Sequence, residues 1–525
     1  MTTKTPLPLV LLALLLPLAA GAAPWDQWRG PGRDGQMPDS PPLATTWPAT
    51  GPKLLWQSEA IPSDTLGGFG SPVVSGGRVY LFVNWKIKTP VAPRKLTENA
   101  LFGMSWFPAD SLTPELVAAM EAARVSDERN ALQGDALTEW LAAWPKTHLT
   151  EAQQQACGPR VTERLRRGKG ALPWEVLTKL VEIKDREFAG QADLDAWFAA
   201  AGFTADQIKT IMQSIPVTLD TASDTVLCLD AATGATVWKH AVEGRATDFG
   251  SSSTPCLAGG RCYVSAAKGV YCLDAATGAE LWRAATQAND NSSSFLVLDG
   301  IAIVQAGEMY GFDAATGALR WKQPTIKGNS PSASYWQHGG KTYLITTGAP
   351  NLSCVDPQTG AVLWTTPNNT VASATVAGDV AVVCNTPAKT GLSAYRLSLT
   401  GAELLWSVEM GDRGVSPLIS GGYVYAVGGQ RVAMRCVDLQ TGATRWEQPF
   451  GSADYSSPVL ADGKLVAVLD NGGSLRLIEA TPDQYRELAK TPMKITRFTT
   501  PAVSDGRVYV RLVDAVACYD LTAAP

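Results

Sequence analysis

Residues 270–282 of this chain spell VYCLDAATGAELW, and the phrase recurs along the sequence. Six copies, some loose, end in Trp238, Trp282, Trp321, Trp364, Trp406 and Trp446. The tryptophans are spaced by roughly 40 residues, a period typical of folds built from repeated units that cannot bury their hydrophobic faces alone. The repeat therefore decides the fold.

Each copy predicts a strand, a tight turn and a returning strand. Alternating apolar residues lead to Asp274, whose carboxylate can accept hydrogen bonds from the backbone ahead of it, and Gly278 suits a positive φ. The closing Trp282 is large enough to wedge between units, and its indole N–H can reach a backbone acceptor. A second hairpin precedes each copy, as in residues 253–264, STPCLAGGRCYV. Two hairpins per unit make a four-stranded antiparallel blade.

The inner strands of these blades can be counted. They begin near Ser71, Ser253, Ser293, Ser332, Ala374, Ser416, Ser457 and Thr500. We therefore predict an all-β fold, an eight-bladed β-propeller of four-stranded antiparallel blades. The last unit has no tryptophan strand, whereas residues 53–57, KLLWQ, form a spare one. We expect this N-terminal strand to complete the C-terminal blade and so to hide open sheet edges.

The β repeat is interrupted within the first blade. Residues 97–216 are helical in pattern, beginning with a capped start at Thr113-Pro114-Glu115. Further helices are predicted over residues 135–144, 150–168, 173–187, 192–201 and 204–214. We interpret them as a helical insertion in blade one. Its predicted core contains Trp140, Trp144, Trp174 and Trp197.

The chain begins with the pattern of a secretory signal peptide over residues 1–22. Lys4 precedes an apolar run that is too short to span a bilayer, and Ala20-Gly21-Ala22 offers small residues for cleavage. We expect residues 23–96 to hold an N-terminal clasp, the closing strand and the start of blade one, and residues 217–525 the rest of the propeller. No cysteine near the cleavage point could carry a lipid anchor, and no later segment is apolar enough to span a membrane. The expected mature protein is a periplasmic or secreted monomer.

Residues 25–35, WDQWRGPGRDG, allow two interpretations. Two tryptophans three residues apart beside a Gly/Pro-rich turn could form a sugar-stacking surface. The favoured alternative is a plug or clasp packed against the propeller, because the stretch leads directly into the closing strand.

The remaining composition excludes several kinds of chemistry. The net charge is −5 and there is no basic stripe, so nucleic acid is not an expected partner. The three histidines are dispersed, so no His-based metal site is predicted. Five of the nine cysteines share one repeat position and are too far apart around a ring to pair, so they are interpreted as small buried strand residues: Cys228, Cys272, Cys354, Cys436 and Cys518. Cys256 and Cys262 flank one hairpin and are left open between a disulfide and two free thiols.

The candidate functional residues lie in the loops that run from one blade to the next and converge on one face. They are polar or charged: Asp248, Asn291, Asn329, Asn369, Arg413, Asp454 and Arg497. Carboxylates, amides and arginines around a channel suit an anionic cofactor with a hard cation such as Ca²⁺. The same composition also suits an ordinary solvated face that binds a protein or carbohydrate partner.

The repeat resembles that of the pyrroloquinoline quinone (PQQ)-like, quinoprotein alcohol dehydrogenase-like propeller family. The resemblance covers roughly residues 25–95 and 217 to the C-terminus. It implies either a PQQ- and calcium-dependent dehydrogenase of alcohols or sugars, or a cofactor-free scaffold similar to the propeller lipoprotein of the outer-membrane β-barrel assembly machinery.

The sequence departs from both kinds of relative. No two cysteines are adjacent, whereas the family dehydrogenases carry a vicinal disulfide, and the lipid-anchoring cysteine of the scaffold is missing. We therefore predict an exported, non-catalytic propeller that acts as a binding or scaffold protein through its polar face, with no cofactor. The alternative is a PQQ- and calcium-dependent dehydrogenase with an atypical site.

Overall fold

The structure is a computed structural model that describes residues 24–522 except 64–66, 91–93, 109–111, 216–217, 245–251, 289–291, 349, 369, 371, 386–390, 411–413, 429–432 and 451–455. The predicted signal peptide, residues 1–22, lies outside the described residues. The chain divides into two compact units. Met1–Ile87 and Thr221–Pro525 form the first, here called the sheet unit, and Lys88–Asp220 form the second, the helical unit.

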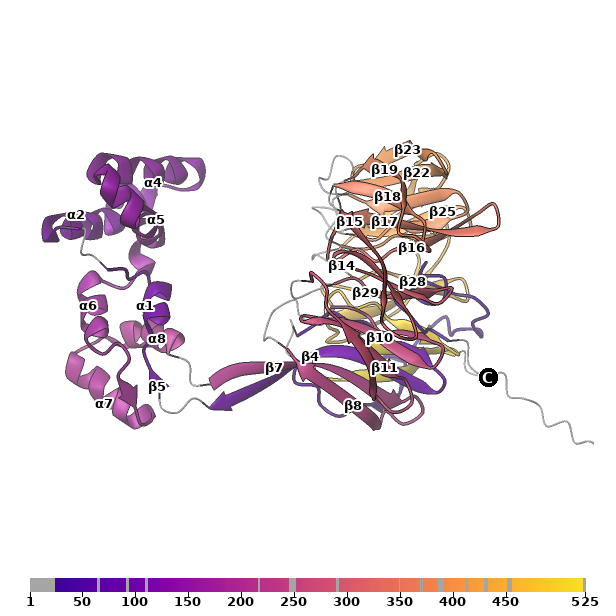
Figure 1. The fold of residues 1–525 in the computed structure, drawn as a ribbon, viewed down its shortest axis with the longest axis horizontal. Coiled ribbons are helices and arrows are strands. Elements are labelled where there is room, and N and C mark those ends of the chain that lie inside the picture. The colour runs from indigo at the N-terminus through magenta and orange to yellow at the C-terminus, as the bar shows by residue number, and fades with distance from the viewer. Residues whose placement is uncertain are drawn as a thin grey trace, which may run out of the picture. The chain divides into compact units, whose positions relative to one another are not determined.

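The described strands of the sheet unit form eight sheets, numbered here along the chain (Figure 1). The first contains β3 (Val73–Ser75), β4 (Arg78–Pro90), β7 (Thr218–Asp230) and β8 (Thr236–Glu243). The second contains β9 (Cys256–Ala258), β10 (Arg261–Ala266), β11 (Gly269–Asp274) and β12 (Glu280–Ala284). The third contains β13 (Leu296–Leu298), β14 (Ile301–Asp313) and β15 (Leu319–Gly328). The fourth contains β16 (Ser334–His338), β17 (Lys341–Gly348), β18 (Asn351–Val355) and β19 (Val362–Pro367).

The other four sheets follow the same order. The fifth contains β20 (Thr375–Ala377), β21 (Val380–Cys384), β22 (Leu392–Ser398) and β23 (Gly401–Val408). The sixth contains β24 (Leu418–Ser420), β25 (Tyr423–Gly428), β26 (Ala433–Asp438) and β27 (Thr444–Pro449). The seventh contains β28 (Val459–Ala461), β29 (Lys464–Leu469), β30 (Ser474–Glu479) and β31 (Glu487–Pro492), with β1 (Gln36–Met37) parallel to β28. The eighth contains β32 (Ala502–Ser504), β33 (Arg507–Arg511), β34 (Val516–Asp520) and β2 (Lys53–Gln57).

This all-β architecture of antiparallel sheets agrees with the prediction, with one difference in strand number. The third sheet has three strands because β14 runs on without a break. Its residues 301–303 pair with β13 and its residues 307–312 with β15, and the register shifts at Gly307, where φ is +79°. One long strand thus serves the second and third positions of the repeat.

The predicted closing strand is confirmed. β2 pairs antiparallel with β34, with Lys53 opposite Asp520 and Trp56 opposite Cys518. The eighth sheet therefore joins the beginning of the described chain to its end. Its outer edge is supplied by residues that lie more than four hundred positions away in the sequence.

Each repeat tryptophan links its sheet to the next, as predicted. The indole Nε1–H groups donate to backbone carbonyls of the following sheet at 2.7–3.1 Å, from Trp56 to Ala231, Trp238 to Ala275, Trp282 to Ala314, Trp321 to Pro357, Trp364 to Ser398, Trp406 to Leu439 and Trp446 to Thr481. The turn glycine of the next repeat lies against the indole. At Gly278, φ is +73° and an added Cβ would lie 2.5 Å from the Trp238 ring. The turn therefore requires glycine both for its backbone conformation and for the space that the indole occupies.

A chain of Ser and Thr hydroxyls also runs from sheet to sheet, just before the inner strands. A backbone N–H of one sheet donates to a hydroxyl of the next at 2.8–3.0 Å, from Ser71 to Thr254, Thr254 to Ser294, Ser294 to Ser332, Ser332 to Ser373, Ser416 to Ser457 and Thr500 to Ser71. The bond from Thr500 to Ser71 joins the eighth sheet to the first. These hydroxyls satisfy backbone donors that are buried at the sheet junctions.

The helical unit contains eight α-helices among its described residues. They are α1 (Glu98–Gly103), α2 (Pro114–Val125), α3 (Asp127–Ala131), α4 (Gly134–His148), α5 (Glu151–Arg167), α6 (Trp174–Glu182), α7 (Gln191–Ala201) and α8 (Ala205–Ser214), with the 3₁₀ turn η1 (Gly168–Gly170) and the two-stranded pair β5 (Arg94–Lys95) and β6 (Glu187–Phe188). The predicted helices are present, except that the one expected over residues 173–187 ends at Glu182 and residues 187–188 form β6; α1 and α3 were not predicted, because each is shorter than two turns. Strands β4 and β7 carry the chain to and from this unit (Figure 1).

The helical unit contains two groups of helices with similar local sequence signals, one with α2, α4 and α5 and the other with α6, α7 and α8. Helices α5 and α8 begin with the same capping box, from Thr150 with Gln153 and from Thr204 with Gln207. Helix α4 carries the sequence WLAA from residue 140 and helix α7 carries WFAA from residue 197. Two separate hydrophobic cores follow. Trp144 is buried in the core of the first group, and Trp140 packs against the same core, partly buried. Trp197 packs against the core of the second group, and Trp174 packs against both cores, in agreement with the predicted core.

All nine cysteines are free thiols and all are buried. The hairpin explains why Cys256 and Cys262 do not pair. Cys256 lies opposite Tyr263 and Cys262 opposite Leu257, so the two side chains point to opposite faces of the sheet.

These thiols are expected to be unreactive in the folded protein. Burial raises the pKa of the Cys256, Cys272 and Cys354 thiols to about 12, and the thiolate is the reactive form. Ellman's reagent at pH 8 should modify no cysteine of the native protein and all nine after denaturation. Rapid modification of even one thiol before unfolding would contradict this burial.

Candidate functional site

The strand order gives the sheet unit two chemically distinct faces. In a meander of four antiparallel strands, the first and third turns lie at one end, and the second turn lies at the other with the loop to the next sheet. The end that carries the Asp-x-x-Thr-Gly turns is here called the turn face. The other end, the loop face, carries the connections 244–255, 285–295, 329–333, 368–374, 409–417, 450–458 and 493–501.

Two of the predicted site residues, Asn329 and Arg497, are described, and both lie in connections of the loop face. Asn329 is half-buried, and its Oδ1 accepts a hydrogen bond from the backbone N–H of Gly307 at 2.6 Å. This contact holds the loop against the bend in β14, so the Asn329 carbonyl oxygen is used within the fold. Asp248, Asn291, Asn369, Arg413 and Asp454 lie outside the described residues.

Arg497 is also half-buried, beside an aromatic pair. Its guanidinium lies 5.9 Å from the centre of the Phe498 ring, which in turn meets Phe69 edge-on at 4.6 Å. Phe498 has a φ of +66°, a conformation that is costly for a bulky residue and clusters at functional sites. A pocket of about 490 Å³ adjoins it, lined by Arg497 and Lys494 among others. This part of the loop face is therefore cationic and partly aromatic, and the described contacts do not join it to Asn329.

The N-terminal stretch is packed into the centre of the sheet unit and is not an exposed sugar-stacking surface. Trp25 is 1% exposed and exchanges two backbone hydrogen bonds with Val74 of β3, each of 2.8 Å. The Asp26 carbonyl accepts from Leu257 N, and the Gly35 carbonyl accepts from Leu460 N, both at 2.8 Å. Residues 24–35, here called the N-terminal plug, thus bond directly to inner strands of the first, second and seventh sheets.

Two buried arginines of the plug reach the intervening sheets. Arg29 donates to Thr375 Oγ1 at 2.6 Å and to the Pro417 carbonyl at 2.7 Å. Arg33 donates to the carbonyls of Ala333 at 2.7 Å and Phe295 at 2.8 Å. The plug therefore contacts each of the first seven sheets at or beside its inner strand. That arrangement places it on the axis around which the sheets are arranged.

These two charges are held by neutral acceptors. Neither arginine makes an ion pair with a described residue, and both are fully buried. Burial lowers the pKa of Arg29 to about 10 and lowers that of Arg33, while burial raises the pKa of the nearby Asp26. Backbone carbonyls, the Thr375 hydroxyl and the Gln27 amide oxygen replace most of the water that the two guanidiniums gave up, as a buried charge requires, whereas Nε of Arg29 has no acceptor among the described residues.

The plug also bears on whether a quinone fits. A planar cofactor centred between the inner strands would need the space that the Trp25, Arg29 and Arg33 side chains fill, so the described residues do not fit PQQ at that level. Among the described residues, no group of three or more His, Cys, Asp or Glu is placed to hold a metal ion. None of the described helices is long and apolar enough to cross a membrane.

The chain belongs to the PQQ-like β-propeller family. Residues 222–367 and 310–522 match the sequence-family model described as outer membrane protein assembly factor BamB, and together they cover more than half of the chain. A comparison with curated proteins gives no match.

Similar solved structures include two kinds of protein. BamB from Moraxella catarrhalis is 16% identical with a TM-score of 0.47, over 58% of this chain and 92% of that one. The quinohemoprotein alcohol dehydrogenase from Comamonas testosteroni is 15% identical with a TM-score of 0.44, over 59% of this chain and 74% of that one. A europium-containing methanol dehydrogenase is 14% identical with a TM-score of 0.45, over 57% of this chain and 82% of that one.

The sequence does carry a signal for the hydroxyl chain. A Ser or Thr precedes proline at the start of many repeats, as in Ser71-Pro72, Thr254-Pro255 and Thr500-Pro501. No local pattern predicts the role of the two plug arginines, because their acceptors on the sheets lie between 261 and 388 residues away.

Proposed function

We propose that this protein is an exported, non-catalytic PQQ-like propeller that binds a protein partner through its loop face. The plug is the observation that carries the proposal. Its buried side chains fill the space between the inner strands that a planar cofactor would need. The terminal guanidinium nitrogens of Arg29 and the guanidinium of Arg33 bond there to carbonyl, hydroxyl and amide oxygens of the protein itself. The cationic and aromatic surface around Arg497 is of a kind enriched in protein interfaces.

The proposal includes the finer architecture. The eight sheets are taken as eight blades of one ring, with residues 97–216 inserted in blade one, residues 23–96 as clasp, closing strand and first strands, and residues 217–525 as the remainder. The bond from Thr500 to Ser71 and the pairing of β2 with β34 support a closed ring. Residues 1–22 are proposed to be a cleaved signal peptide of a periplasmic or secreted monomer. The family name, outer membrane protein assembly factor, is consistent with such a location.

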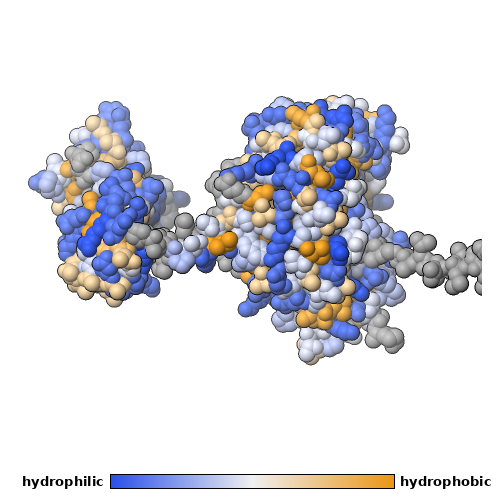
Figure 2. Space-filling model, turned by 60° about the horizontal axis from the view of Figure 1, so that its bottom comes forward, coloured by the Kyte–Doolittle hydropathy of each residue, from blue (hydrophilic) through white to orange (hydrophobic). Residues whose placement is uncertain are grey.

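The surface supports a polar mode of binding. On the face drawn in Figure 2, hydrophobic residues form small separate groups among hydrophilic ones. Isolated exposed apolar residues are normal on soluble proteins, whereas large apolar patches mark hydrophobic interfaces. The charge and aromatic contacts for a partner of the loop face would come from the surface around Arg497, and a carbohydrate is the other partner class that such a surface suits.

Thermal unfolding of the mature protein, residues 23–525, with and without PQQ plus Ca²⁺ tests the non-catalytic function. A ligand at about 100 times its dissociation constant stabilises a protein by roughly 2.7 kcal/mol, which is a readable shift. We expect no shift and no reduction of an artificial electron acceptor with alcohols or sugars. A shift that a chelator abolishes would overturn the proposal in favour of a PQQ- and calcium-dependent dehydrogenase.

Site-specific photo-crosslinking in the producing cell tests the binding face. The photoreactive residue replaces Arg497 on the loop face or, as a matched control, the exposed Arg445 beside the turn face. We expect one discrete protein adduct from position 497 and none from position 445. Adducts from position 445 alone would place the partner on the wrong face, and a carbohydrate adduct at position 497 would change the partner class.

A further inference from the structure

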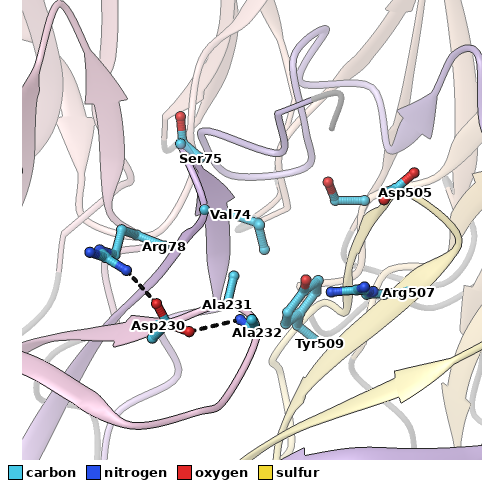
Figure 3. A pocket seen from close by; sticks show the side chains of 12 residues that line it. Val74, Ser75, Arg78, Asp230, Ala231, Ala232, Asp505, Arg507 and Tyr509 are labelled. Atoms are coloured by element: carbon cyan, nitrogen blue, oxygen red, sulfur yellow. Dashed lines mark hydrogen bonds and ion pairs between the residues drawn. The ribbon is translucent and has the colours of Figure 1, made fainter. Parts of the chain in front are cut away.

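A second pocket opens on the turn face, at the junction where the eighth sheet meets the first (Figure 3). Its volume is about 550 Å³, within the range of small-molecule sites. One wall is the β3–β4 hairpin with Arg78, a second is the β32–β33 hairpin with Arg507 and Tyr509, and the turn after β7 forms a third. The pocket therefore lies between residues from opposite ends of the sheet unit's sequence.

The Arg78 side of the pocket is already neutralised. Asp230 Oδ2 accepts from Arg78 Nη1 at 2.5 Å. The other carboxylate oxygen accepts from the backbone N–H groups of Ala232 and Thr233 and from the Thr233 hydroxyl. Both oxygens of Asp230 are thus engaged, so this carboxylate has little capacity left for a cationic ligand.

Arg507 occupies the same strand position as Arg78 without the same partner. It begins β33 as Arg78 begins β4, and it lies opposite Asp520 in the sheet. Asp520 Oδ1 instead accepts from the backbone and hydroxyl of Thr522, and among the described residues Arg507 makes no ion pair. Arg507 therefore lines the pocket as a cation that interacts with the Asp520 charge at a distance but makes no ion pair with a described carboxylate.

Tyr509 adds a hydroxyl that differs from its counterparts. The hydroxyls of Tyr80 and Tyr263 each donate to a carbonyl of the next sheet, Ala275 and Ala314, at 3.0 Å. The corresponding carbonyl for Tyr509 is that of Ala231, which accepts from Trp56 Nε1 at 2.9 Å as Ala275 and Ala314 accept from their own tryptophans. Within the described part of the chain, the Tyr509 hydroxyl has no carbonyl acceptor of this kind, and its side-chain partners are Arg507 and Cys518.

We propose that this pocket binds a carboxylate carried by a small, mainly apolar group, either the C-terminus of a short peptide or a free acid of similar size. A guanidinium that makes no ion pair with a described residue, joined to a phenol hydroxyl at the same pocket wall, matches a carboxylate, which accepts several hydrogen bonds at once. The remaining walls come from Val74, Ala231 and the Tyr509 ring, which suit methyl-sized side chains. Exposed Asp505 at the rim disfavours a second negative charge, so monocarboxylates are preferred.

Calorimetric titration of the full mature protein tests this site with N-acetyl-alanyl-alanine and its C-terminal amide. We expect the free acid to bind and the amide to bind at least about tenfold more weakly, because the charged acceptor is lost. Propionate separates the two sources of carboxylate. Binding of propionate as tight as that of the peptide would assign the pocket to small acids, and much weaker binding would assign it to peptide ends.

Three variants locate the binding. Arg507→Gln should weaken binding of the free acid by about tenfold or more, and Tyr509→Phe by about fivefold, as expected for a charged and a neutral hydrogen bond. Arg261→Gln is the matched control, because Arg261 begins β10 as Arg507 begins β33 but borders a different junction. The affinity of Arg261→Gln for the free acid should remain within twofold of that of the unmodified protein.

Equal affinity of the acid and the amide would overturn the proposal, as would unchanged binding to Arg507→Gln or an equal loss in Arg261→Gln. Circular dichroism and the unfolding midpoint show whether each variant is folded. If Arg507→Gln does not fold, Tyr509→Phe still tests the proposal, because it keeps the packed aromatic ring and removes only the hydroxyl. The outcome is independent of the loop-face proposal, because the pocket lies on the other face.

Discussion

Replacing Arg33 with methionine is expected to destabilise the protein by about 3 kcal/mol, although the substitution removes a charge from the interior. The side chains are of similar length, but methionine donates no hydrogen bond. The carbonyls of Ala333 and Phe295, which accept from Arg33 at 2.7 and 2.8 Å, would remain buried without donors. Each such orphaned group costs about 1–3 kcal/mol, which outweighs the desolvation that Arg33 no longer suffers. Urea unfolding followed by tryptophan fluorescence measures the change.

Two further substitutions make the Arg33 experiment specific. Arg33→Lys keeps the charge, but its single ammonium group cannot reproduce the planar fork, so an intermediate loss is expected. Arg283→Met is the matched control, because the Arg283 side chain is 69% exposed and pairs only with Glu280 at the surface. The control should change stability by less than about 0.5 kcal/mol. Equal midpoints for Arg33→Met and the unmodified protein would show that the plug is not held by its arginines.

Trp282→Ala is expected to cost about 3–5 kcal/mol, the usual range for truncating a large buried aromatic residue. Trp282 is 8% exposed, packs against Gly317 of the next repeat, and donates from Nε1 to the Ala314 carbonyl at 3.1 Å. The substitution removes both the ring that fills the junction between the second and third sheets and the bond that crosses it. The same urea unfolding experiment measures the loss.

The neighbouring residue supplies the control for Trp282. Leu281 is 47% exposed on the same strand, so Leu281→Ala should lie within about 0.5 kcal/mol of the unmodified protein. Trp282→Phe keeps an aromatic ring but loses the hydrogen bond, and it should cost less than the alanine variant. A loss for Leu281→Ala as large as that for Trp282→Ala would contradict the role given to the sheet junction.

The repeat predicted the sheets well because its signals are local. The alternation before Asp274, the turn to Gly278 and the following tryptophan all lie within thirteen residues, and the structure confirms each. The closing strand was predictable for a different reason. The count of tryptophan strands left one spare at residues 53–57 and one missing at the C-terminus, so the pairing followed from the repeat itself.

The features that could not be predicted from the sequence depend on partners that are distant in the chain, or on which face of a strand a side chain points to. The role of Arg33 required knowing that Phe295 and Ala333 present carbonyls toward the centre of the sheet unit. The fate of Cys256 and Cys262 required the register of one hairpin, because a shift of one residue exchanges the faces of a strand. Asn329 was predicted as a site residue from its type and position, but its amide oxygen serves the bend at Gly307.

The pairing of β2 with β34 also constrains the order of folding. Lys53 must find Asp520, and Arg29 must find Thr375, which lies 346 positions further along the chain, so these early residues acquire their partners late although Trp25 pairs with the nearby Val74. Loop-closure entropy opposes such long-range contacts until much of the intervening structure exists. The N-terminal segment therefore lacks part of its native partners until synthesis is nearly complete, and the eighth sheet forms only when both ends of the chain are present together.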